Sequence, residues 1–236
     1  MEPDVIDEIG VEAKTPETKS KGLARVEIFT DGVFAIAITL LVLDIHVPVV
    51  KGDVSLLQAL LHDWETYLAF LIGFFTLLVC WINHLYMFEF IGRMNDKLLL
   101  LNGFKLLVVS FTPFATALLS HYISTNQQQT AITIYAFNFF LMGLAMTSIW
   151  LYALKKGLIS QTSAPVLKAS TTLYILASVL SGTIFILSFF TIWVCLPLFV
   201  LMFLIFVFPA NVVAFLVKRM TRRSHSTVKS KLVHSA

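Results

Sequence analysis

The stretch Arg25-Val-Glu-Ile-Phe-Thr-Asp-Gly-Val-Phe-Ala-Ile-Ala-Ile-Thr-Leu-Leu-Val-Leu-Asp44 decides the fold of this chain. It is the first long apolar run, yet it begins with polar groups, among them Glu27 and Asp31. Charged groups at membrane depth are costly, so they usually have a function or a buried partner. We therefore expect this segment to be more than a membrane anchor.

The composition around this stretch is that of a membrane protein. Of the 236 residues, 58% are hydrophobic and only 13% are charged, whereas soluble domains carry about 25% charged residues. Several apolar runs exceed the roughly 20 residues that a membrane-spanning helix needs. The two cysteines, Cys80 and Cys195, both lie in apolar runs, which favours packed cysteines over a disulfide framework or a metal site. We predict an all-α polytopic membrane protein with almost no soluble domain.

Six membrane spans are predicted. Four lie at about 26–47, 67–90, 98–122 and 131–154, with polar loops between them. The 49 residues from Ala169 to Val217 carry no charge, and as one helix they would be about 70 Å long. Because the hydrocarbon core is about 30 Å thick, this stretch crosses twice, with a turn expected near 188–191. Pro197 and Pro209 are expected to kink the sixth helix.

Lysine and arginine set the expected orientation. With the N-terminus in the cytoplasm, fifteen of the seventeen lie inside, Lys51 lies outside, and Lys105 lies within the third span. This places both termini in the cytoplasm. The predicted organisation is a disordered cytoplasmic tail at 1–24, a six-helix domain at 25–218 and a basic cytoplasmic tail at 219–236.

A helical wheel divides the first span into two faces. One face is a continuous apolar stripe made of Phe29, Gly32, Ile36, Leu40, Leu43 and Val47. Glu27 and Asp31 fall on the opposite face, and Thr39 flanks the stripe. Taken alone, such a stripe indicates a lipid-facing or packing surface. The carboxylates must point into protein or water, so the stripe is expected to face away from the rest of the bundle.

Partners for Asp31 can be predicted from depth in the membrane. The second span runs in the opposite direction, so its residues at the same depth lie shortly before Phe90. These candidates are Trp81, Asn83 and His84, with Asn102 and Lys105 on the third span as further ones. Indole, amide and imidazole N–H groups can all donate to a carboxylate. We predict a polar cluster that joins the first three spans near the cytoplasmic side.

The pattern Arg25-x-x-x-Phe29-Thr30-Asp31 closely resembles the Arg-x-x-x-Phe-Ser-Asp signature of the transmembrane protein 175 family of potassium channels. Trp81, His84 and the six spans of a short chain fit its prokaryotic members, which have one six-helix repeat per subunit. Thr30 stands where the family usually has serine and keeps the hydroxyl. The chain lacks a Thr-Val-Gly-Tyr-Gly filter, as the family does.

The resemblance implies a homotetramer whose first helices line a central pore. Ile36 would form the narrowest apolar ring, Leu40 and Leu43 further rings toward the outside, and Thr39 the hydroxyl position linked to potassium preference. The structural residues would be Arg25, Phe29, Thr30, Asp31, Trp81, Asn83 and His84. The implied function is passive passage of potassium through a hydrophobic gate in the cell membrane. The implied partners are lipid and the permeant ion, with no cofactor, metal or nucleic acid.

Other functions fit some of the same residues. A proton-coupled secondary transporter could use Asp31, His84 and Lys105 as a relay, although no inverted repeat is visible. A membrane enzyme is disfavoured because the histidines do not follow a metal-binding spacing. Asp44, beyond the apolar stripe, either raises the local cation concentration or is an ordinary surface carboxylate. A purely structural membrane protein leaves the polar start of the first span unexplained.

Overall fold

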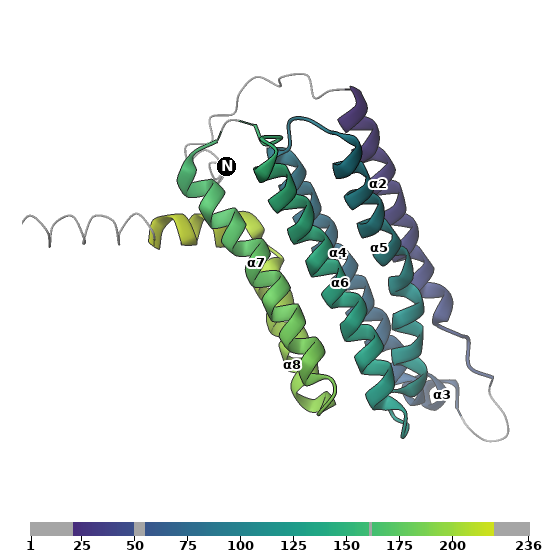
Figure 1. The fold of residues 1–236 in the computed structure, drawn as a ribbon. Helices are drawn as coiled ribbons and strands as arrows, with labels where there is room; N and C mark the ends of the chain where they lie inside the picture. The colour runs from purple at the N-terminus through teal and green to yellow at the C-terminus, as the bar shows by residue number, and fades with distance from the viewer. Residues whose placement is uncertain (1–20, 50–54, 161, 220–236) are drawn as a thin grey trace, which may run out of the picture.

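The computed structural model describes residues 21–49, 55–160 and 162–219, and this part of the chain is helical (Figure 1), with one isolated bridge between Ile91 and Ile159. The labelled helices are α2 (Lys21–Leu40), α3 (Leu56–His62), α4 (Trp64–Phe90), α5 (Asp96–Tyr122), α6 (Gln128–Lys155), α7 (Ala164–Leu187) and α8 (Ile192–Phe206). A further helix, Pro209–Arg219, follows α8. A short 3-10 helix, η1 (Leu41–Asp44), continues α2. The predicted all-α membrane architecture is confirmed, since five helices are long and apolar enough to cross a membrane.

The first span begins earlier than predicted. Residues 21–24, which were assigned to the disordered tail, form the first turn of α2, and Leu23 is fully buried. The burial of Leu23 explains the early start, because it attaches this turn to the bundle. The remainder of that predicted tail, and the basic tail beyond Arg219, lie outside the described residues.

The sixth span is broken instead of being one kinked helix. Pro197–Phe206 and Pro209–Arg219 are both helical but meet at 77°, and Figure 1 shows the last helix lying crosswise to α7 and α8. Pro197 lies inside α8 without ending it. The break comes directly before Pro209, which has no N–H to donate and disfavours a helical residue ahead of it. The bent pair makes the sixth span if it is counted as one.

Helix α3 was not predicted, because its residues stand in a polar loop of the sequence. The Ser55 hydroxyl accepts from the Gln58 N–H at 3.2 Å, and the Gln58 side chain accepts from the Ser55 N–H at 3.1 Å. This reciprocal capping box satisfies two free donors at the start of the helix. The capping box explains why a short helix forms just before α4.

Helix α5 holds the bundle together by packing against α2, α4 and α6, and α6 packs against α7. Glycines allow two of these close approaches. A Cβ on Gly73 would lie 2.7 Å from the Thr116 hydroxyl of α5, and one on Gly143 would lie 2.7 Å from the Ser181 hydroxyl of α7. Small residues of this kind let membrane helices pack closely. Figure 1 shows that α2 lies at one edge of the bundle and that α7 and α8 lie at the other.

Candidate functional site

Helix α2 has one buried face and one exposed face. The buried face consists of Leu23, Thr30, Phe34, Ala37 and Leu41. The exposed face contains the whole predicted stripe of Phe29, Gly32, Ile36, Leu40, Leu43 and Val47. Ile36 is 61% exposed and Leu43 is 70% exposed. As expected, the stripe faces away from the rest of the protomer.

The first polar link between α2 and the bundle is made by Asp31. Its Oδ1 accepts a hydrogen bond of 2.9 Å from the indole N–H of Trp81 on α4. Hydrogen bonds to a charged acceptor are roughly twice as strong as neutral ones. The predicted contact between these two helices is therefore present, and it turns the carboxylate away from the apolar stripe.

The second link is made by the neighbouring residue, Thr30. Its hydroxyl accepts a hydrogen bond of 3.0 Å from the Asn102 amide of α5. Thr30 and Asn102 are 0% and 1% exposed. The two groups can form this hydrogen bond at only one rotation of α2 about its axis. Any other rotation would leave a buried polar group unpaired, which costs free energy. The hydroxyl that the resemblance expects at position 30 thus has a defined partner.

The third link is a buried pair of side chains, His84 on α4 and Lys105 on α5, which the ring of Phe34 on α2 covers. The Lys105 Nζ lies 2.8 Å from Nδ1 of His84, and both side chains are fully buried. The Nζ also lies 5.5 Å from the ring centroids of Phe34 and Phe88, within cation–π range. Both residues were expected beside Asp31, whereas the structure pairs them with each other.

Three residues of the predicted cluster lie elsewhere. Asn83 donates to the carbonyl of Phe206 at 2.8 Å, so it attaches α4 to the end of α8 instead of to α2. Phe29 is 66% exposed and belongs to the apolar stripe. Arg25 is exposed on the first turns of α2. These side chains lie away from Asp31 because neighbouring residues of an α-helix point in different directions around its axis.

Thr39 carries the one hydroxyl on the exposed side of α2. This hydroxyl lies 3.0 Å from the carbonyl of Ala35 and 2.9 Å from that of Ile36, and donates back to the helix. The side chain is itself exposed. Because its one proton is directed to the backbone, the oxygen presents its lone pairs as an acceptor.

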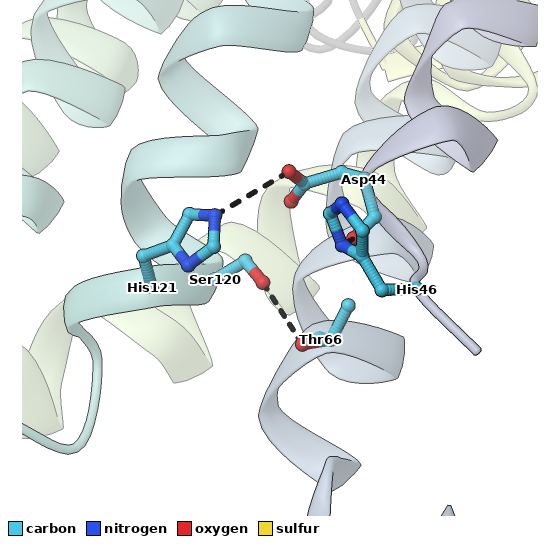
Figure 2. A network of polar contacts seen from close by, with 5 residues as sticks. All are labelled: Asp44, His46, Thr66, Ser120 and His121. Carbon is cyan, nitrogen blue, oxygen red and sulfur yellow. Dashed lines mark hydrogen bonds and ion pairs between the residues drawn. The ribbon is translucent and has the colours of Figure 1, made fainter. Parts of the chain in front are cut away.

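A small group of polar contacts lies beyond the other end of α2, around η1, as Figure 2 shows. Asp44 Oδ1 lies 3.6 Å from Nε2 of His121 at the end of α5. His46 Nδ1 lies 2.9 Å from the Asp44 carbonyl, and the Ser120 hydroxyl donates to Thr66 at 3.1 Å. Sequence reasoning missed His121, although the depth argument used for Trp81 places it level with Asp44. Among the described residues, no three His, Cys, Asp or Glu side chains come together as a metal site.

The chain is similar in sequence to known proteins. A family model described as endosomal/lysosomal potassium channel TMEM175 matches residues 25–113, which contain the three polar links. A potassium channel of Chamaesiphon minutus is 38% identical over 184 residues, covering 76% of this chain and 90% of that protein. A potassium channel of Streptomyces collinus is 36% identical over 157 residues, covering 65% and 76%.

The structure is also similar to a solved one. The crystal structure of a lysosomal potassium-selective channel TMEM175 homolog from Chamaesiphon minutus matches with a TM-score of 0.74 and 35% identity. The match covers 81% of this chain and all of that one. Sequence, fold and the signature at the start of α2 agree, and the chain belongs to the TMEM175 family.

Proposed function

We propose that this chain is the subunit of a homotetrameric, potassium-preferring cation channel in the cell membrane, with α2 lining a central pore. The observation that carries this proposal is the asymmetry of α2. Three polar links hold one face against α4 and α5, while the opposite face presents an unbroken apolar stripe to the outside of the protomer. The bacterial relatives named potassium channels support the same function.

The gate of such a pore is an apolar constriction. In a tetramer the stripe contributes a ring of four Ile36 side chains, followed by rings of Leu40 and Leu43. A narrow apolar ring excludes water and closes a pore by dewetting. Opening then requires only that the rings move apart. Each α2 moves together with α4 and α5, because the three polar links join these helices.

Ion preference arises from dehydration and from Thr39. Potassium sheds its water more easily than sodium, so a narrow apolar ring favours potassium without a filter made of carbonyl groups. Thr39 lies one turn from the Ile36 ring, and its hydroxyl oxygen is available as an acceptor. A ring of four such oxygens replaces part of the lost hydration shell.

The test is ion flux through purified protein in liposomes with opposed potassium and sodium gradients. A passive, voltage-driven flux that favours potassium is the expected result. Flux that appears only with a proton gradient would replace the channel with a proton-coupled transporter, in which the buried Lys105–His84 pair is the first candidate relay. No flux under either condition would remove both functions.

A further inference from the structure

A cavity of about 590 Å³ is lined by residues of α4, α6, α7 and α8, and by none of α2. Its walls are formed by apolar side chains such as Ile72, Val79, Met142, Met146, Ala177 and Phe203. Its size falls within the range of roughly 300–1,000 Å³ that is usual for small-molecule sites. The proposed pore does not use any part of it.

Several polar groups in the cavity wall already have hydrogen-bond partners within the protein. The Thr76 hydroxyl pairs with that of Tyr135 at 2.8 Å, and the Tyr174 hydroxyl donates to the Asn83 carbonyl at 3.3 Å. The Asn83 amide donates to Val79 and Phe206. A polar ligand would therefore lose its hydration without replacement, which is costly. The chemistry of the wall selects a hydrocarbon.

The cavity opens sideways between α4 and α8. Its lip carries Leu71 and Phe75 on α4 and Val200 and Leu204 on α8, which are between 40% and 62% exposed. Leu71 and Phe75 lie in a helix that is long and apolar enough to cross a membrane, and Val200 and Leu204 lie in the bent pair that passes the same test as one span. We therefore expect the opening to meet hydrocarbon and not water. A lipid tail can enter there without crossing a polar surface.

A neighbouring subunit is a poorer occupant than lipid. Helix α8 packs on α4, α6 and α7, and Figure 1 shows α7 and α8 at the edge of the bundle opposite α2. If four α2 helices surround the pore, as the proposed function requires, the lip lies at the periphery of the tetramer. We propose that this cavity binds one acyl chain of a bilayer phospholipid, which enters between α4 and α8.

The test is native mass spectrometry of the full chain, purified in mild detergent and reloaded with dioleoylphosphatidylglycerol. Val200→Trp places a large ring at the lip, and because Val200 is 58% exposed the change leaves the core intact. The matched control is Leu201→Trp, the next residue of α8, which is 51% exposed and does not line the cavity. We expect Val200→Trp to lose most of the bound lipid, and wild type and Leu201→Trp to retain it.

A second pair of variants tests the interior of the cavity. Ala177→Phe fills it from α7, whereas Val179→Phe introduces the same ring on the exposed side of that helix. Equal lipid retention in all variants would overturn the proposal, as would a change in oligomeric state with Val200→Trp and no loss of lipid. Retention is measured without an ion gradient, so loss of the channel function and loss of the lipid site give separate results.

Discussion

The Trp81 indole donates its hydrogen bond to the Asp31 carboxylate across the α2–α4 contact, at a distance of 2.9 Å. Asp31 lies on the side of α2 opposite the apolar stripe, so this bond fixes how the helix is rotated. A contact on one side of α2 therefore determines which residues the opposite side presents to the proposed pore.

Loss of the Asp31 carboxylate should reduce assembly. We expect Asp31→Ala to lower the yield of folded tetramer, and Trp81→Phe to destabilise the protein by about 1.5–3 kcal/mol, the contribution of a hydrogen bond to a charged group. Size-exclusion chromatography with light scattering and thermal unfolding in detergent measure both. Normal tetramer with normal current in Asp31→Ala would disprove the anchoring role.

A polar side chain in the predicted constriction should let water in. We expect Ile36→Asn to raise the leak current in liposomes, because an amide hydrates the ring that otherwise dewets. Leu107→Asn on α5, at a position that is 66% exposed but outside the stripe, is the control and should leave the current unchanged. If conductance in Ile36→Asn equals that of wild type, Ile36 is not the gate.

The hydroxyl of Thr39 should contribute to ion preference. We expect Thr39→Ala to lower the preference for potassium over sodium, seen as a shift of the reversal potential toward zero under opposed gradients. Thr183→Ala on α7 removes a hydroxyl that is also exposed and bonded back to its helix. An equal shift in both variants would show that Thr39 has no specific role.

Asn83 should stabilise the end of α8. We expect Asn83→Ala to cost about 1–3 kcal/mol, because it leaves the buried Phe206 carbonyl without its donor. Hydrogen exchange should then accelerate in the helix Pro209–Arg219, while Asn211→Ala on the exposed side of that helix serves as the control. Protection that stays at the wild-type level would mean that the bend is held by other contacts.

The buried Lys105–His84 pair distinguishes a structural role from a proton relay. We expect Lys105→Met to destabilise the protein by about 1–3 kcal/mol, since Nδ1 of His84 loses its partner. Passive potassium flux through the protein that still folds should persist. Selective loss of flux driven by a proton gradient would instead assign the pair to transport.

Much of α2 could be predicted because its pattern is local. The wheel separated Ile36 from Asp31, and depth in the membrane gave Trp81 as one of several candidate partners for Asp31, of which the structure pairs Trp81 with it. Depth gives only the height of a side chain, however, and not its direction around the helix axis. Asn83 lies two residues from Trp81, about 200° around α4, and therefore meets α8. Pro209 predicted a disruption of the sixth span, but a proline does not by itself fix an angle, so the 77° bend could not be predicted from it.

The break in the sixth span also affects the bilayer thickness that suits this protein. The 15 residues of α8 rise only about 22 Å, whereas a typical hydrocarbon core is about 30 Å thick. After the break the helix Pro209–Arg219 runs crosswise and carries Lys218 and Arg219 in its last turn, and their long side chains can reach toward head groups. Hydrophobic mismatch of this kind is relieved by thinning the surrounding lipid. We therefore expect the bilayer to be thinner beside α8 than beside α4, α5 and α6, whose 27 or 28 residues are long enough for a hydrocarbon core of full thickness.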